Sequence, residues 1–166
     1  MLRRLEEKDA SLMLEWMHDD TINCNFQYPF KEMTIEKVKN FIEYSFNEEN
    51  QHFAIVDEKD EYLGTISLKN ISYKNGNAEY AIVTRKNAQG TGVARLATCE
   101  LLQYAFEELK LHKVYLNVLA ENIRARKFYE KCGFMQEGIS KDAVKINGKY
   151  ESLIWYGIIK KEKEDE

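Results

Sequence analysis

The sequence predicts a mixed α/β fold of the α+β class, in which helices flank a mostly antiparallel sheet. Three observations lead to this class. Apolar residues recur at helical spacing through much of residues 1–50, and three strand-like segments separated by turns follow from residue 51. A helical segment then connects a strand at 78–84 to one at 111–119, and such a right-handed crossover makes the two strands parallel neighbours.

The composition indicates a single domain over residues 1–166, with 44% hydrophobic and 31% charged residues. No apolar run of secretory length follows the basic start, and no later segment approaches about 20 uncharged residues. We therefore expect a cytoplasmic protein that does not enter membranes. The three cysteines, Cys24, Cys99 and Cys132, form no CxxC pair and give little support to a disulfide, and we expect no metal site.

The net charge of −4 is unevenly distributed, because residues 1–50 carry eleven acidic and six basic side chains. A nucleic-acid-binding protein needs a basic face to neutralise phosphates, so we expect no nucleic-acid partner. The acidic N-terminal third would instead attract a cationic substrate. The solvated surfaces of helices explain such acidic residues equally well.

The N-terminal third is predicted to be mostly helical. Residues 1–5 are expected to form a short edge strand, and Asp9 can cap a helix. A linker at 19–33 contains the only proline, and Thr34 then opens a second helix. The apolar positions that define these helices are Leu12, Trp16 and Met17 in the first, and Ile35, Val38, Ile42 and Phe46 in the second.

The middle of the chain has the period of strands. Strands are expected at 53–56, 62–68 and 78–84, separated by charged or polar turns. The dipeptide Asn75-Gly76 is the strongest hairpin signal, because both residues tolerate a positive φ. These segments are expected to form an antiparallel meander.

Helices and strands alternate in the remainder of the chain. An apolar stripe predicts a helix from Val93 to Leu109, and a strand at 111–119 follows. A further helix at 122–131 is expected to end near Gly133. The last predicted elements are strands at 134–139 and 150–159 and a charged tail.

The segment Gln89-Gly90-Thr91-Gly92-Val93-Ala94 lies between a strand and a helix. Its two glycines allow several backbone N–H groups to converge on one anion, and the helix N-terminus adds a partial positive charge, so a pyrophosphate is a natural ligand. A glycine-rich connection without function would look the same locally. A dinucleotide fingerprint would need a third glycine at Arg95, and a P-loop would need Gly-Lys-Ser/Thr; neither is present.

This segment, as Gln89-x-x-Gly92-x-Ala94, resembles the acetyl-coenzyme A signature of the GNAT family of N-acetyltransferases, Gln/Arg-x-x-Gly-x-Gly/Ala. Farther along, the stretch from Asn122 to Phe134 resembles the second cofactor segment of that family, Asn-x-x-Ala followed by a tyrosine and a Gly-Phe ending. Ala78-Glu79-Tyr80 and Ile146-Asn147-Gly148-Lys149-Tyr150 resemble the branch that includes spermidine, ribosomal-protein alanine and aminosugar N-acetyltransferases. The resemblance covers nearly the whole chain.

The resemblance implies a GNAT-like fold, a twisted sheet of about seven strands flanked by about four helices. In that fold the strands corresponding to 78–84 and 113–119 are the single parallel pair, and they splay apart. The resemblance also divides the domain into an acceptor-side region (1–50), a cofactor-binding core (51–133), C-terminal strands (134–160) and a charged tail (161–166).

Acetyl-coenzyme A is the co-substrate that the resemblance implies. Ile82 and Val83 would contact its acetyl-pantetheine arm, and Asn122, by itself a helix N-cap, would contribute a further contact. Arg126 and Lys127 supply cationic groups for the phosphates of the adenosine end. The pyrophosphate would lie against Gln89, Gly90, Thr91, Gly92, Val93, Ala94 and Arg95.

Two side chains are the catalytic candidates. An alkyl ammonium has a pKa near ~10.4 and must lose a proton before it attacks a thioester, and Glu79 is the expected base, acting through water. An exposed carboxylate that only orients the substrate is the alternative. Tyr129 is the expected acid for the departing thiolate, although its spacing with Ala125, Phe128 and Cys132 is also that of a core residue.

The acceptor is expected to bind between the N-terminal helices, a property that the resemblance assigns to that region. Asp19, Tyr28, Glu32 and Glu36 are the candidate contacts, because carboxylates and aromatic faces can hold a polyamine through ion pairs and cation–π interactions. The alternative acceptors are an aminosugar and a protein N-terminus. The alternative to an enzyme is a catalytically silent regulatory module that only binds acetyl-coenzyme A. The resemblance also favours a homo-oligomer, a dimer above all.

Overall fold

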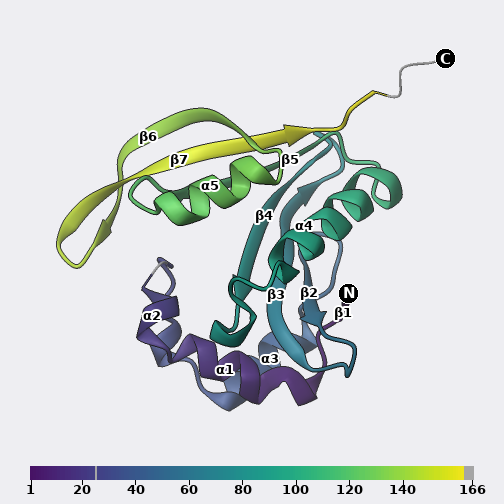
Figure 1. Cartoon of the computed structure of the whole chain (residues 1–166), viewed down its shortest axis with the longest axis vertical. Helices are drawn as coiled ribbons and strands as arrows, with labels where there is room; N and C mark the ends of the chain where they lie inside the picture. Colours follow the sequence, from purple (N-terminus) through teal and green to yellow (C-terminus); the bar gives the residue numbers. More distant parts are fainter. Residues whose placement is uncertain (25, 163–166) are drawn as a thin grey trace.

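The structure is a computed structural model that describes residues 1–24 and 26–162. Within this part of the chain there is one sheet of seven strands, in the order β1-β2-β3-β4-β5-β7-β6 (Figure 1). All neighbouring strands are antiparallel except β4 and β5. The predicted α+β class with one parallel pair is thus confirmed. The strands are β1 (Leu2–Arg4), β2 (Gln51–Val56), β3 (Tyr62–Ser72), β4 (Asn77–Thr84), β5 (Lys113–Leu119), β6 (Met135–Ile146) and β7 (Lys149–Ile159).

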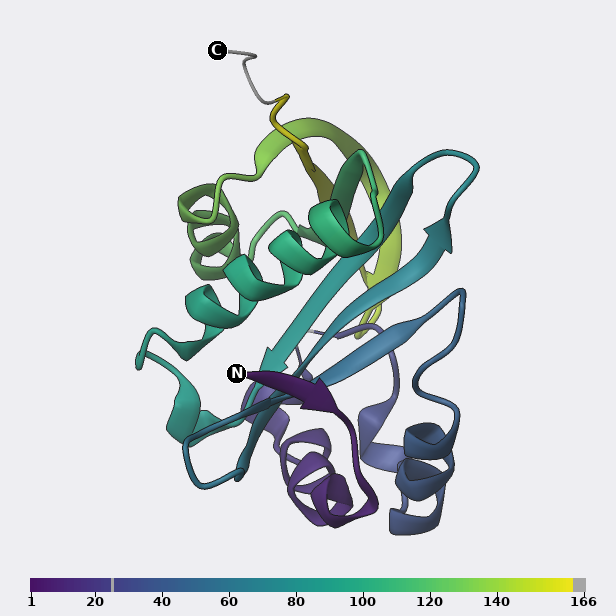
Figure 2. The same ribbon diagram turned by 90° about the vertical axis from the view of Figure 1, so that its right-hand side faces the viewer.

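Helices pack on both faces of this sheet. Successive residues of β2 point to opposite faces of the sheet. Ile55 lies in the hydrophobic cluster formed with α4, whereas Ala54 lies in the cluster formed with α1 and α3. In Figure 2, α4 runs across the sheet and the N-terminal helices lie below it. The α-helices are α1 (Ala10–Met17), α2 (Asp20–Asn23), α3 (Ile35–Glu43), α4 (Val93–Gln103) and α5 (Ile123–Lys131).

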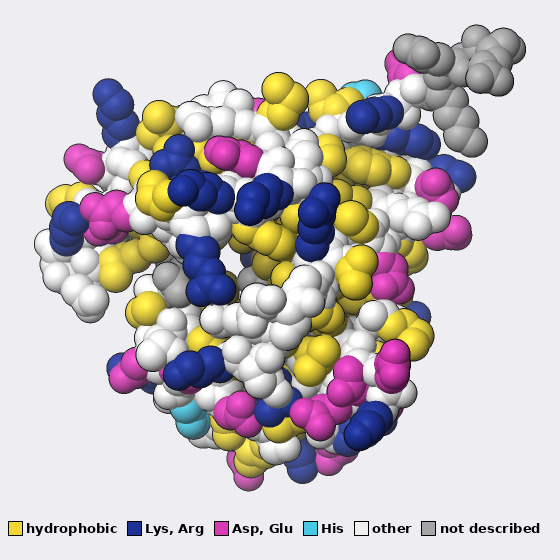
Figure 3. All heavy atoms as spheres, viewed as in Figure 1, with side chains coloured by type: hydrophobic (Ala, Val, Ile, Leu, Met, Phe, Trp, Pro, Cys, Tyr) yellow, Lys and Arg dark blue, Asp and Glu magenta, His cyan; other side chains and the backbone are white. Residues whose placement is uncertain are grey.

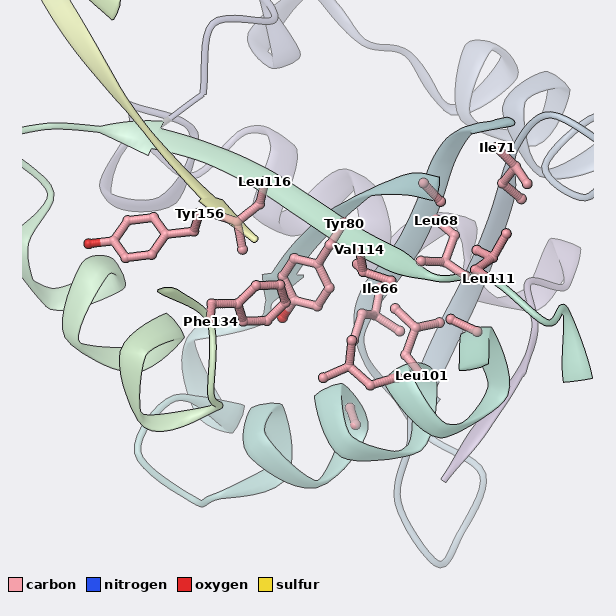
Figure 4. Close-up of a cluster of buried hydrophobic side chains, with 14 of the residues drawn as sticks. Ile66, Leu68, Ile71, Tyr80, Leu101, Leu111, Val114, Leu116, Phe134 and Tyr156 are labelled. Atoms are coloured by element: carbon pink, nitrogen blue, oxygen red, sulfur yellow. The ribbon is translucent and has the colours of Figure 1, made fainter. Parts of the chain in front are cut away.

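The larger core lies between the sheet and the helices α4 and α5 (Figure 4). Leu101 of α4 packs in one cluster with Ile66 and Leu68 of β3 and Val114 of β5, and each of these side chains is at most 1% exposed. Each such side chain stabilises the fold by roughly 1.5–3 kcal/mol through removal of its apolar surface from water. This packing fixes α4 against the sheet.

The N-terminal helices are held to the sheet by buried polar contacts. Trp16 donates its ring N–H to the hydroxyl of Tyr62 at 3.0 Å. Asp9 does not cap α1 with its side chain as predicted, because a 3-10 turn at Glu7–Asp9 precedes the helix. The Asp9 carboxylate instead accepts the backbone N–H of Glu6 at 2.9 Å and forms a two-bond ion pair with Arg3 at 2.8 Å.

The parallel strands β4 and β5 separate soon after they pair. Their register joins Asn77 to Lys113 and ends with Glu79 opposite Tyr115, although β4 continues to Thr84. From Tyr80 onward β4 keeps its partner β3, and on its β5 side it pairs with no strand among the described residues. The splay therefore begins directly beyond Glu79, and it leaves backbone groups of both strands free to bind a ligand.

The predicted boundaries differ from the structure at several places, including the following three. The segment expected as a linker contains the short helix α2, which Asp19 caps by accepting the backbone N–H of Thr21 at 2.9 Å. The strand expected at 134–139 extends as β6 to Ile146, because it continues to pair with β7 beyond a register shift between Ser140 and Val144. The helix expected to reach Leu109 changes at Tyr104 into a π-helical turn, Tyr104–Glu108.

Asn75-Gly76 lies in the connection of the antiparallel β3–β4 hairpin, as predicted, and a second Asn-Gly pair forms a tighter hairpin turn. Asn147 and Gly148, with φ of 50° and 79°, form the two-residue turn between β6 and β7. Of Asn75 and Gly76, only Gly76 has a positive φ, because the connection between Ser72 and Asn77 is longer than two residues. A two-residue turn of type I′ demands positive φ at both positions, whereas the longer connection does not.

Of the expected charged tail, residues 163–166 lie outside the described residues. Among the described helices, none has both the length and the hydropathy needed to cross a bilayer.

Candidate active site

A cleft of about 790 Å³ opens where β4 and β5 separate. It is visible in Figure 3 as the hollow between the upper lobe, which contains α5, and the N-terminal helices below. Its floor is formed by the splayed strands, and its walls by the start of α4, by α5 and by the segment before α3. The predicted site residues that line it are Tyr28, Glu79, Ile82, Val83, Gln89, Gly90, Gly92, Ala94, Arg95, Asn122 and Tyr129.

The glycine segment at one end of the cleft has the geometry of an anion site. Gly90 and Gly92 have φ of 76° and 84°, and α4 begins at the next residue. In the described part of the chain, the backbone N–H groups of Gly90, Gly92, Ala94 and Arg95 have no acceptor. A Cβ atom at either glycine would meet nothing within 4 Å, so the space beside these donors is open for a phosphate.

Thr91 and Val93, the two segment residues outside the cleft lining, support this turn from within. The Thr91 hydroxyl donates to the carbonyl of Ala88 at 2.6 Å and accepts the N–H of Val93 at 3.4 Å. Asn122, on the opposite wall, accepts the N–H of Ala125 at 3.2 Å and so caps α5 while it lines the cleft.

Basic side chains surround the phosphate end. Arg95 and Arg124 line the cleft, and Lys127 lies exposed on α5 outside the lining. Figure 3 shows Lys and Arg side chains gathered over this part of the upper lobe. Arg126 points elsewhere, because its guanidinium donates to the carbonyl of Ala120 at 3.0 Å and to the hydroxyl of Tyr156 at 3.3 Å. The exposed cations create a positive field suited to several phosphates.

Tyr129 is packed in the core and lines the cleft at the same time. Its ring lies edge-on to Tyr80 at 5.8 Å and to Phe134 at 6.1 Å between centroids. Burial, and to a lesser degree the Cys132 thiol, raises the pKa of Tyr129 to about 12, so the phenol stays protonated at neutral pH. Its hydroxyl has no hydrogen-bond partner among the described residues and is free to donate into the cleft.

Glu79 lies at the vertex of the splay, with its side chain 17% exposed. Its Oε1 accepts the side-chain amide of Asn117 at 3.2 Å, and its Oε2 accepts that of Asn70 at 3.2 Å and lies 3.4 Å from the Nζ of Lys69. Burial and then the Glu79 charge raise the pKa of Tyr115. The carboxylate, which β4 carries, is thus held from both neighbouring strands, β3 and β5, at one point of the cleft.

The cleft connects the two faces of the sheet. Tyr80 packs in the core beneath α4, so its chain neighbour Glu79 projects from the opposite face. Tyr129 lies on the α4 side, and Asn117 shares the face of Glu79. Two substrates can therefore approach the splay from opposite sides and meet between β4 and β5.

Aromatic side chains from the segment before α3 form the wall on the Glu79 side. Phe26, Tyr28 and Phe30 line the cleft, and Phe30 lies 4.9 Å from both Trp16 and Tyr28 between ring centroids. Tyr28 is 58% exposed, and its ring face is available to a cationic ligand.

The three predicted acidic acceptor contacts lie outside the cleft lining. The hydroxyl and amide of Thr21, together with the charge of Lys86, lower the pKa of Asp19, whose carboxylate is used as the cap of α2. Glu32 and Glu36 are exposed on the turn before α3 and on its first turn. Of the four predicted acceptor residues, the structure brings only Tyr28 into the cleft.

Sequence reasoning missed the residues that hold Glu79. Asn117 interrupts an otherwise apolar strand, and this polar residue between Leu116 and Val118 was a signal that the sequence contained. Lys69 and Asn70 end an apolar run in β3 and had no comparable signal, because only the register of β3 against β4 brings them to Glu79.

A splayed parallel strand pair beside a two-glycine helix start, with a phenol and a carboxylate at the splay, defines an acetyl-coenzyme A-dependent acyltransferase. Residues 1–135 match the model of the acetyltransferase (GNAT) domain family. The chain belongs to the GNAT family of acetyltransferases, and acetyl-coenzyme A is its acyl donor.

Individual relatives agree with this family. The chain is 32% identical over 158 residues to a spermidine N(1)-acetyltransferase of Vibrio cholerae, across 92% of this chain and 88% of that one. Identity to the spermidine N(1)-acetyltransferase of Escherichia coli K12 is 28% over 158 residues, across 92% and 82% of the two chains. The crystal structure of the Vibrio cholerae spermidine N-acetyltransferase in complex with CoA and spermine has a TM-score of 0.87 at 29% identity, across 96% of this chain and 94% of that one.

Replacement of Gly92 by alanine tests the phosphate end of the cleft. We expect Gly92→Ala to weaken coenzyme A binding about tenfold and to lower stability by about 1 kcal/mol, because an L-residue at φ 84° is strained and the turn would shift its N–H groups. Titration calorimetry with coenzyme A and thermal denaturation measure the two effects. Gly138→Ala on β6, where a Cβ meets open space, is the matched control, and an unchanged coenzyme A affinity of Gly92→Ala would contradict the assignment.

Proposed function

We propose that this chain transfers the acetyl group of acetyl-coenzyme A to a primary amine of a polyamine such as spermidine, by direct attack within a ternary complex. The observation that carries the proposal is the cleft through the sheet. It joins the phosphate-binding segment on one face to Glu79 and the aromatic wall on the other. Because both substrates reach the splay at once, no acetylated enzyme intermediate is needed.

Each catalytic candidate has a role that its position supports. Glu79 takes a proton from the ammonium group through a water molecule, and the neutral amine nitrogen then adds to the thioester carbon to form a tetrahedral oxyanion. The nitrogen passes a second proton to the same water, and the carbon–sulfur bond breaks as the carbonyl re-forms. Backbone N–H groups of β4 that lack a strand partner beyond the splay are placed to hold the developing oxyanion. The Tyr129 hydroxyl donates to the departing thiolate.

The acceptor class is inferred from the wall on the Glu79 side and from the relatives. In an extended polyamine, cationic ammonium groups alternate with apolar methylene chains. The aromatic side chains of Phe26, Tyr28 and Phe30 offer apolar contact to the methylene chains and cation–π interactions to the ammonium groups. The Vibrio cholerae and Escherichia coli relatives are named for spermidine, and the former has been solved with spermine. Both lines favour a polyamine over an aminosugar or a protein N-terminus.

A panel of acceptors tests this proposal. Release of free thiol from acetyl-coenzyme A is measured with spermidine, spermine, aminosugars and peptides that begin with Ala or Ser. We expect the polyamines to give the highest kcat/KM. Preference for an aminosugar or a peptide would replace the acceptor but retain the reaction. If coenzyme A binds and no amine accelerates thiol release, the chain is a binding module and the catalytic proposal is wrong.

A cytoplasmic location and assembly as a homodimer belong to the proposal as well. The dimer is the assembly that the resemblance to the family, matched over residues 1–135, favours. Cell fractionation tests the first, and light scattering coupled to size exclusion tests the second.

A further inference from the structure

The last residue pair between β4 and β5 joins Glu79 to Tyr115. Asn117 lies two residues farther along β5, and its side chain is the first beyond that pair to face the same side of the sheet as Glu79. Its side-chain amide donates to Oε1 of Glu79 at 3.2 Å. A carboxylate has only acceptor atoms, so the Nδ2 of Asn117 must face Glu79, and this fixes the orientation of the amide. The Oδ1 of Asn117 accepts no hydrogen bond from the described residues, although Asn117 lines the cleft.

Asn117 is one of three side chains that contact the carboxylate of Glu79. Lys69 and Asn70 already hold Oε2 from β3, on the side away from β5. Support of the carboxylate therefore does not depend on Asn117 alone. Asn117 adds something that Lys69 and Asn70 do not, which is a free amide oxygen beside the carboxylate inside the cleft.

We propose that Asn117 is a further substrate-contacting residue, whose Oδ1 accepts an N–H of the attacking amine next to Glu79. This inference rests on the proposed function. A neutral amine attacks with its lone pair, so its N–H bonds must be held on the side away from the thioester. The amide oxygen of Asn117 and the water molecule held by Glu79 accept those N–H bonds on one face of the splay, and they turn the lone pair toward the opposite face, where Tyr129 lies.

Two variants separate contact with the amine from support of Glu79. Asn117→Leu removes both the hydrogen bond to Glu79 and the free oxygen at similar volume. Asn70→Gly removes a hydrogen bond of the same length to Glu79 and touches neither the cleft lining nor the backbone conformation, because Asn70 has a φ of 50° that glycine adopts freely. Their steady-state kinetics with spermidine are compared with those of the wild type.

The expected result is a split between the two kinetic constants. For Asn117→Leu we expect the amine KM to rise about tenfold, the scale of one lost hydrogen bond to a substrate, while the KM for acetyl-coenzyme A stays within about twofold. Asn70→Gly should raise the amine KM less than threefold, by roughly the few tenths of a kcal/mol that an exposed contact contributes. Equal changes in the two variants would reduce Asn117 to a supporter of Glu79 and overturn the inference.

A binding measurement keeps the inference separate from the proposed function. Titration of spermidine into the coenzyme A complex needs no turnover, and it should show weaker binding by Asn117→Leu than by Asn70→Gly. Identical spermidine affinity in the wild type and Asn117→Leu overturns the role of Asn117 even if the enzyme is active. Wild-type binding without turnover overturns the proposed function, and the comparison of affinities still decides the role of Asn117.

Discussion

Replacement of Tyr129 by phenylalanine is expected to lower kcat about 10²–10³-fold while leaving the affinity for coenzyme A within about twofold. The ring and its edge-on contacts with Tyr80 and Phe134 are retained in Tyr129→Phe. The hydroxyl has no hydrogen-bond partner among the described residues, so its removal leaves no buried group unsatisfied. The loss should therefore appear in the chemical step, measured as kcat with saturating spermidine and acetyl-coenzyme A.

The pKa of Tyr129 decides how its hydroxyl contributes. At about 12 it lies above the value near ~8.5 of a thiol, so complete proton transfer to a free thiolate would be unfavourable. A hydrogen bond to the sulfur as its charge develops avoids this difficulty and is stronger in the transition state than in the bound thioester. The wild-type rate should consequently show no alkaline limb from Tyr129 below about pH 12.

Tyr156 supplies the control for this substitution. Its ring lies 6.4 Å from that of Tyr129, its hydroxyl donates to Glu130 at 3.0 Å, and it does not line the cleft. Tyr156→Phe should cost about 1 kcal/mol of stability and leave kcat near the wild-type value. If Tyr129→Phe retains the wild-type kcat, the hydroxyl has no part in the reaction and Tyr129 is a core residue only.

The parts of the site that could be predicted are those whose conformation depends on residues adjacent in the sequence. The positive φ of Gly90 and Gly92 and the free N–H groups at the start of α4 follow from the local sequence, because few other residues adopt that turn. The position of Asn122 as the N-cap of α5 also follows from the local sequence. The splay of β4 and β5 has no local signal and was expected only from the family resemblance.

The remaining parts depend on the register between strands. Lys69 and Asn117 reach Glu79 from β3 and β5, and a slip of one residue in either strand would turn them to the other face. The length of β6 likewise comes from its pairing with β7, which resumes at Val144 beyond a register shift after Ser140. Short α2 escaped prediction because four residues are too few for helical periodicity.

Replacement of Glu79 by glutamine is expected to lower kcat/KM for the amine about 10²–10³-fold at neutral pH. The variant keeps the length of the side chain and removes the base. The substrate must then lose its proton to solvent, so the rate should keep rising with pH toward the pKa of the free alkyl ammonium, near ~10.4. The measurement is kcat/KM for spermidine as a function of pH, with coenzyme A affinity as the check on folding.

The same experiment separates a base from a group that only orients the substrate. Asn117 and Asn70 both donate to the carboxylate, and Lys69 lies 3.4 Å from it. A glutamine at position 79 turns its own NH2 toward at least one of these donors. The amine site is therefore loosened whether Glu79 is the base or only orients the substrate. Loosening raises the amine KM but leaves the shape of the pH profile unchanged, whereas loss of the base moves the profile to higher pH. Glu79→Asp retains a carboxylate one methylene shorter and should keep the wild-type profile at a reduced rate. An unaltered profile in Glu79→Gln would assign proton removal to another group and leave Glu79 as a positioning residue for the amine.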